Sequence, residues 1–185
     1  GSWMGGMPGT PWWRVRSQSG GQHVEQTTHV FDVCRYLLQA NAVSVHAVAA
    51  KGGMTDKPNY DIEDISFVNV TFDNGTIANI QSACCLSGWG RVKMEVFGRD
   101  LVADVTQGRA IFTTGPEQTE EIKSTGNPYE TEDRIFIDAV KSGDGSEIRA
   151  PYADAVETQK IMIAATRSMD TGKLVFIQND QLVIA

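Results

Sequence analysis

The middle of the chain is a series of short segments rich in β-branched and aromatic residues, several of them joined by very short turns. Asn74-Gly75 joins two of these segments, and this dipeptide supplies the positive φ angles of a type I′ hairpin turn. Parallel neighbours need a crossover of a dozen or more residues, so short turns require antiparallel pairing. The pattern therefore predicts an antiparallel meander, with strands at 43–51, 64–72, 76–84, 91–98, 101–105 and 109–114 and a further candidate at 119–123.

Helical periodicity precedes and follows this meander. From 23 to 39, apolar side chains cover a stripe too wide for a surface helix, so a largely buried helix is predicted there. Two more helices are predicted at 129–142 and 153–170, followed by a short strand at 174–177. This order indicates an α+β fold: an open, predominantly antiparallel sheet with helices packed on one face. The other face is then wet or covered by a second copy, so we expect a homo-oligomer formed through the sheet face.

We predict one domain over residues 1–185: a loop-rich segment at 1–21, an α+β core at 22–177 and a tail at 178–185. Three tryptophans in the first segment predict docking, either under the domain's own core or as the wall of a cleft or partner domain. The chain starts without an initiator methionine, so a piece of a longer protein is expected.

Composition excludes several classes of function. Sixteen basic residues against 23 acidic ones give a net charge of −7, which argues against nucleic-acid binding. There is no apolar run long enough for a membrane span and no signal peptide. Three cysteines without characteristic spacing are typical of reduced thiols, so we expect a cytoplasmic location. Cysteines and histidines also lack metal-ligand spacing, and no metal site is predicted.

One polar stripe stands out on the first predicted helix. Gln22, Glu25, His29 and Asp32 follow one another at spacings of three, four and three, which place them on one face. Polar groups on a buried element are costly unless they pair or contact a ligand. Glu25 and His29 are placed to hydrogen-bond, which would orient the imidazole as a general acid or base near neutral pH.

Two interpretations of this stripe remain open. In the functional one, Gly20-Gly21 leaves the amides at the helix start uncrowded and open to a substrate oxygen. In the structural one, Glu25 and His29 simply satisfy each other, and Asp32 forms a surface pair with Arg35. Residue spacing alone does not choose between them.

Several motifs together resemble a known family. Ordered along the chain, they are Trp13-Arg14, Gly20-Gly21-Gln22, Glu25-x-x-x-His29-x-x-Asp32, Arg35-Tyr36-Leu37, Phe136-x-x-Ala139-Val140-x-x-Gly143 and Ala164-x-x-x-Ser168-x-x-x-Gly172-Lys173-x-Val175. This combination resembles the C-terminal domain of the Gfo/Idh/MocA oxidoreductases, the glucose–fructose oxidoreductase and inositol dehydrogenase group.

The resemblance implies half of a two-domain enzyme. The missing N-terminal Rossmann domain would hold NAD or NADP, and this domain would bind a small sugar, cyclitol or polyol and form the oligomer. Carried over from the family, His29 and Glu25 are the catalytic candidates, beside a lysine of the Rossmann domain. Trp13, Arg14 and Gln22 would line the substrate side, and Asp32 would be structural.

This chain also departs from the complete family pattern. It contains no Gly-x-Gly-x-x-Gly loop, and Lys57-Pro58 follows Asp56 where the family motif has Glu-Lys-Pro. No cofactor-binding residues are therefore predicted, and the chain alone is expected to bind no cofactor and to be inactive. Two alternatives stay open: a non-catalytic carbohydrate-binding or assembly module, and part of an NAD-dependent lyase or glycosidase.

Overall fold

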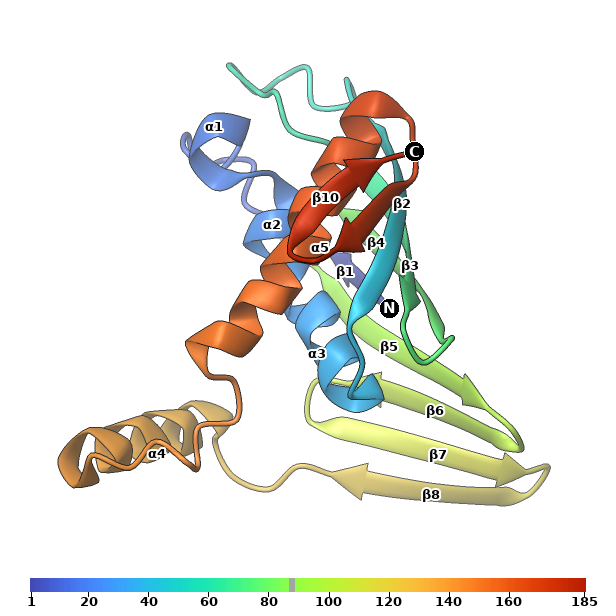
Figure 1. Ribbon diagram of the computed structural model, residues 1–185, viewed down its shortest axis with the longest axis vertical. Coiled ribbons are helices and arrows are strands. Elements are labelled where there is room, and N and C mark those ends of the chain that lie inside the picture. Colours follow the sequence, from blue (N-terminus) through green and yellow to red (C-terminus); the bar gives the residue numbers. More distant parts are fainter. Residues whose placement is uncertain (87–88) are drawn as a thin grey trace. The chain divides into compact units, whose positions relative to one another are not determined.

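The computed structural model describes residues 1–86 and 89–185. These residues form two compact units where the sequence predicts one domain: Gly1–Glu95 with Glu157–Ala185, and Val96–Val156. Strand β5 (Arg91–Gly98) and helix α5 (Tyr152–Thr171) each run from one unit into the other (Figure 1).

The first unit contains a mostly antiparallel sheet. Its strands lie in the order β10-β9-β2-β3-β4-β1-β5, and β1 with β4 is the parallel pair. The remaining elements of this unit are β1 (Ser2–Met4), α1 (Arg16–Ser19), α2 (Gln22–Glu25), α3 (Thr28–Leu38), β2 (Ala42–Ala50), β3 (Ile65–Phe72), β4 (Ile77–Ala83), β9 (Val175–Gln178) and β10 (Gln181–Ile184).

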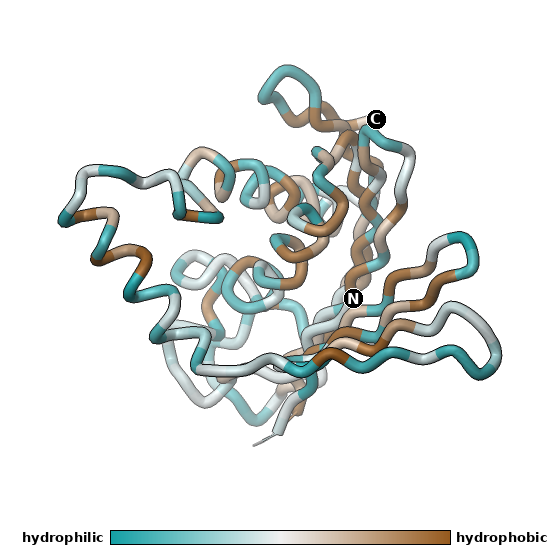
Figure 2. Tube along the Cα trace, turned by 90° about the horizontal axis from the view of Figure 1, so that it is seen from below, coloured by the Kyte–Doolittle hydropathy of each residue, from teal (hydrophilic) through white to brown (hydrophobic). Residues whose placement is uncertain are grey.

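The core of this unit lies between one sheet face and the helices. Val45 stands opposite Val70, and Val68 opposite Ile80, and all four side chains are buried. Helices α2, α3 and α5 lie on this side of the strands (Figure 1). They contribute further buried residues: Val30, Phe31, Cys34, Ile161, Ala164 and Ala165. Hydrophobic residues accordingly follow the strands and helices in Figure 2, while the turns between strands are hydrophilic.

The second unit is a three-stranded antiparallel meander followed by a helix. It comprises β6 (Leu101–Thr106), β7 (Arg109–Gly115), β8 (Gln118–Lys123) and α4 (Pro128–Ser142). The Asn127 side chain caps α4 by accepting the Tyr129 N–H at 3.0 Å, and the helix ends at Gly143 with φ 74°. These are standard start and stop signals of a helix.

The predicted fold class is confirmed: an α+β fold with a mostly antiparallel sheet and helices on one face. Two strands were missed, because β1 lies in the segment predicted as loop and β10 lies in the predicted tail. Both are short, and each is defined by its pairing: β1 lies between β4 and β5, and β10 pairs with β9 at the edge of the sheet.

The first predicted helix is broken into α2 and α3. The Thr27 N–H bonds the Gln22 carbonyl at 3.2 Å, five residues back, and the buried Thr27 hydroxyl bonds Ser82 at 2.7 Å. A side chain that bonds outside the helix competes with the regular ladder at this point. The apolar stripe that predicts a largely buried helix over 23–39 is buried only in part, since Val33 and Leu37 lie on the exposed side of α3.

Candidate functional site

Glu25 ends helix α2 with its carboxylate held in place. Its Oε2 accepts the indole N–H of Trp13 at 2.9 Å. Trp13 is fully buried and packs with Ile62, Cys84 and Tyr60. A half-buried carboxylate is thus fixed by a rigid aromatic donor.

His29 lies in the first turn of α3 and is exposed. Its ring packs near that of Trp3, with centroids 5.4 Å apart and planes tilted by 32°. Within the described part of the chain, Glu25 and His29 share no hydrogen bond, so the pair predicted from their spacing does not form. The reason is the break at Thr27, because a spacing of four brings side chains together only along one continuous helix.

Gln22 and Arg14 tie down the N-terminal segment. Gln22 is fully buried, and its Nε2 donates to the Gly5 carbonyl at 2.6 Å. The Arg14 guanidinium donates to the Pro8 carbonyl at 3.2 Å. Trp13 and Gln22 are both fully buried, so a substrate cannot reach them in this structure. The substrate-side role of Trp13, Arg14 and Gln22 therefore stays a prediction.

The start of α2 is closed, contrary to the predicted opening toward a substrate oxygen. Glu63 fills this place: its Oε1 accepts the His23 N–H at 3.3 Å. The Gly21 N–H is also used, by the Ser19 hydroxyl at 3.0 Å. A carboxylate of the protein itself therefore satisfies the amide that the sequence assigned to a ligand.

His23 and Glu63 form a fully buried pair. The His23 Nδ1 lies 2.7 Å from the Glu63 Oε1, and the His23 Nε2 lies 3.0 Å from the hydroxyl of Thr166 on α5. Burial by itself raises the pKa of the Glu63 carboxyl, but the hydrogen bond and charge of His23 outweigh it and hold that pKa below its usual range. Glu63 is forty residues from His23 in the sequence. A spacing pattern within one helix or strand therefore cannot predict this pair.

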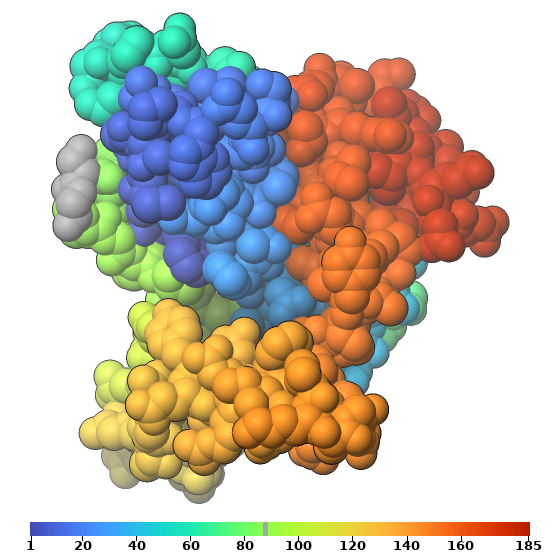
Figure 3. Space-filling view, turned by 90° about the vertical axis from the view of Figure 1, so that its left-hand side faces the viewer, coloured from blue at the N-terminus to red at the C-terminus, as the bar shows by residue number. Residues whose placement is uncertain are grey.

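Asp32 and Arg35 meet through a third residue. The hydroxyl of Thr158 donates to the Asp32 carboxylate at 3.0 Å and accepts from the Arg35 guanidinium at 3.1 Å. Arg35 is buried, so this contact joins α3 to α5 rather than forming the predicted surface pair. Figure 3 shows the blue N-terminal helices lying directly beside the orange α5.

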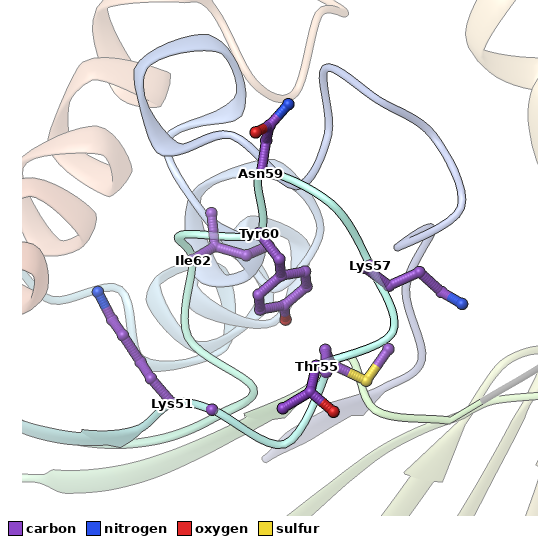
Figure 4. Close-up of a pocket in the computed structure, with 8 residues that line it drawn as sticks. Lys51, Thr55, Lys57, Asn59, Tyr60 and Ile62 are labelled. Atoms are coloured by element: carbon purple, nitrogen blue, oxygen red, sulfur yellow. The ribbon is translucent and has the colours of Figure 1, made fainter.

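A pocket of about 310 Å³ lies in the loop between β2 and β3 (Figure 4). It is lined by Lys51, Gly52, Met54, Thr55, Lys57, Asn59, Tyr60 and Ile62. Its ammonium, amide and hydroxyl groups are suited to hydrogen bonds with hydroxyls or carboxylates. Tyr60 and Ile62 also belong to the cluster around Trp13, so the pocket shares a wall with the group that holds Glu25.

Two of the three thiols, Cys34 and Cys84, are buried. The Cys84 sulfur lies 2.6 Å from the Tyr60 hydroxyl, and burial raises the pKa of Cys84 to about 12. Burial likewise raises the pKa of Tyr60 and of Cys34. A thiol must ionise to act as a nucleophile or metal ligand, and the raised pKa values of Cys34 and Cys84 disfavour that ionisation near neutral pH. Over residues 1–86 and 89–185, no group of three His, Cys, Asp or Glu side chains is placed to hold a metal ion.

The profile of the GFO/IDH/MocA C-terminal domain matches residues 1–102. The chain belongs to this family. It is 27% identical over 181 residues to the uncharacterized oxidoreductase YrbE of Bacillus subtilis (strain 168), an alignment covering 89% of this chain and 50% of YrbE. It is 25% identical over 179 residues to the uncharacterized protein UNK4.17 of Schizosaccharomyces pombe, covering 85% and 44%. The chain therefore spans about half the length of these relatives.

Solved structures share the fold of this GFO/IDH/MocA domain. Levoglucosan dehydrogenase in complex with NADH and levoglucosan superposes with a TM-score of 0.78 at 16% identity, covering 95% of this chain and 57% of the enzyme. GenD2 from gentamicin A biosynthesis, in complex with NAD, gives 0.76 at 21% identity, covering 96% and 54%. Aldose-aldose oxidoreductase from Caulobacter crescentus, complexed with glycerol, gives 0.75 at 18% identity, covering 95% and 55%. None of the helices built from the described residues has the length and apolarity that a bilayer crossing requires.

Proposed function

We propose that this chain is the substrate-binding and oligomerisation domain of an NAD(P)-dependent oxidoreductase that acts on a sugar, cyclitol or related polyol. The observation that carries the proposal is Glu25, whose carboxylate is held by Trp13 at the end of α2, together with the exposed His29 at the start of α3, in a domain of the GFO/IDH/MocA family. The sugar-related dehydrogenases among the neighbours support the class of substrate.

In this proposal, His29 moves the proton of a substrate hydroxyl. An exposed imidazole is accessible to a ligand, and imidazole is the side chain most often used as a general acid or base. The ring of Trp3 limits its orientation on one side. Glu25 would accept a hydrogen bond from the substrate with the oxygen that Trp13 does not use. Arg14, Trp13 and Gln22 would complete the substrate side, Trp13 by holding Glu25 and Gln22 by holding Gly5.

The dinucleotide does not fit the residues of this chain. Dinucleotide sites of the expected kind need a glycine-rich turn between a strand and a helix in a parallel unit. In the described residues, the parallel pair is β1 with β4, and the three-residue β1 is followed by a loop instead of a helix. We therefore assign NAD or NADP to the Rossmann half of the whole protein.

The open sheet face supports the proposed homo-oligomer. Val183, Phe176, Ser44, Thr71 and Ile77 form one row across the sheet on the side away from the helices. Val48 and Phe67 stand opposite each other four residues along the strands from the Ser44–Thr71 pair, and Ile77 is 72% exposed. A second copy would remove these apolar side chains from water. The three free cysteines support the proposed cytoplasmic location.

The test is turnover by the whole protein that carries this chain. We expect His29→Ala to lower kcat by about 10²–10⁴-fold, the usual contribution of a general acid or base. Leu37→Ala is the matched control, because it truncates an exposed side chain on the same helix. Wild-type turnover by the His29 variant would overturn the catalytic assignment and favour a non-catalytic carbohydrate-binding module. Product analysis separates net oxidation from a lyase or glycosidase reaction that regenerates its NAD.

A further inference from the structure

A buried acid–base pair that takes no part in the proposed chemistry joins three segments of the first unit. His23 comes from α2, Glu63 from the turn before β3 and Thr166 from α5. The side chains of His23 and Glu63 are both fully buried. Burying two ionisable groups is costly unless they are paired and hydrogen-bonded, so the stability of this arrangement depends on the hydrogen bonds that the two side chains make.

The hydrogen bonds assign the protons of His23. The Thr166 hydroxyl donates its single proton to the Met162 carbonyl at 3.0 Å, so its oxygen accepts from the His23 Nε2. On the other side of the ring, an ionised Glu63 carboxylate can only accept, so the His23 Nδ1 donates to it. With donation from both ring nitrogens, this set of hydrogen bonds corresponds to an imidazolium ring.

Other charged groups near the pair agree with an ionised Glu63. The Arg16 guanidinium lies 3.7 Å from the Glu63 Oε2 and pairs with Asp170 of α5 at 2.7 Å. Asp64, the next residue along the chain, directs one oxygen away to the Gly53 N–H at 2.6 Å. The Glu63 carboxylate thus faces the Arg16 guanidinium from α1 and the His23 ring from α2.

Helix α2 depends on such anchors because it has only four residues and is separated from α3. A helix this short has no stability of its own. Three of its side chains hold it: Gln22 to Gly5, His23 to Glu63 and Thr166, and Glu25 to Trp13. Of these contacts, the one to Glu63 pairs full opposite charges with no access to water, where their attraction is strongest.

We propose that Glu63 is a positioning residue of the reaction: its buried carboxylate holds His23 as an imidazolium and so fixes helix α2, which carries Glu25. The positioning role rests on the proposed function, whereas the imidazolium does not. The two parts are therefore tested separately.

The protonation state is tested by NMR of the wild-type 185-residue chain at neutral pH. Spectra that correlate ring nitrogens with ring C–H protons distinguish an imidazolium, with two similar nitrogens, from a neutral ring, with two very different ones. His29→Gln and His46→Gln variants assign the three histidine signals. We expect an imidazolium for His23. A neutral His23 with Thr166 donating to Nε2 would overturn the proposal.

The positioning role is tested in the whole protein with Glu63→Gln, which keeps the shape and removes the charge. We expect the His23 ring to become neutral and kcat to fall by about 10–100-fold, the scale of a small misplacement of a catalytic group, with KM changed far less. Glu63→Asp should recover part of kcat, and the exposed Glu147→Gln is the control. Unchanged kcat with a neutral His23 would overturn the role.

If Glu63→Gln does not fold, a second variant tests whether Glu63 is the cause of the imidazolium. Thr166→Val removes the acceptor of the Nε2 proton and leaves Glu63 intact. We expect His23 to stay doubly protonated, with faster exchange of the Nε2 proton, and loss of the imidazolium would count against Glu63 as its cause. If instead His29→Ala retains turnover while His23 is an imidazolium, the proposed function fails and the assignment of the pair stands.

Discussion

At the scale of single residues, the buried Glu63 links stability to pH. Its pKa is lowered in the folded chain, from an ordinary value of 4.5, so the unfolded chain takes up the proton more readily than the folded one does. The stabilisation is therefore complete above the ordinary pKa and is lost as the pH falls through the lower, folded pKa.

We therefore expect the free energy of unfolding to decrease as the pH falls below 4.5, and to decrease less in Glu63→Gln. At about pH 7 the variant should be about 2 kcal/mol less stable than wild type, because the neutral His23 ring loses its hydrogen bond to a charged carboxylate. Urea unfolding at several pH values measures this. Asp144→Asn is the control, because that carboxyl also has a lowered pKa, through Ser146, but is fully exposed. Parallel pH profiles for wild type and Glu63→Gln would contradict the linkage.

At the scale of elements, α2 is set by the turn that precedes it. Gly21 has φ 100°, and a Cβ there would lie 2.8 Å from the Glu63 Oε2. Glycine is required here twice, by the positive φ and by the close carboxylate. The functional interpretation, in which Gly20-Gly21 leaves the amides uncrowded and open to a substrate oxygen, is wrong, because the Glu63 carboxylate occupies this place.

Comparing two alanine variants isolates the contact with Glu63. Gly52 has the same φ of 100° and open space around a Cβ, so Gly52→Ala measures the backbone strain alone, about 1 kcal/mol. Gly21→Ala should cost about 1–3 kcal/mol more, because the added methyl displaces a buried carboxylate. Thermal or chemical unfolding of both variants makes the comparison. If Gly21→Ala and Gly52→Ala destabilised the chain equally, the Glu63 carboxylate would be able to move away from the added methyl group without an energetic cost.

At the scale of the whole molecule, the exposed sheet face decides the proposed assembly. Phe67, Ile77 and Val183 face away from the helices, and Asn79 bonds Asn69 at 2.8 Å on the same face. Apolar side chains set among paired amides suit a contact between copies, since both kinds of group can be satisfied across it.

We expect the chain to self-associate and Ile77→Asp to shift it toward monomer, because a buried unpaired carboxylate costs several kcal/mol. Sedimentation velocity over a range of concentrations measures the change. Ile163→Asp is the control, as Ile163 is an exposed isoleucine on α5, on the helix side of the sheet. A wild-type chain that stays monomeric at high concentration would exclude this face as the interface.

The sequence by itself determined the fold class, most of the strands and helices, and the family. These follow from local patterns: alternation along Ile65–Phe72, the turn at Asn74-Gly75 and the apolar face of α5. Tertiary structure decided the environment of the site. The break at Thr27 separates Glu25 from His29, Trp13 holds Glu25, and Glu63 reaches His23 from forty residues away. Contacts between segments that are distant in the sequence depend on how the helices and strands pack. The spacing of side chains along one segment therefore cannot predict them.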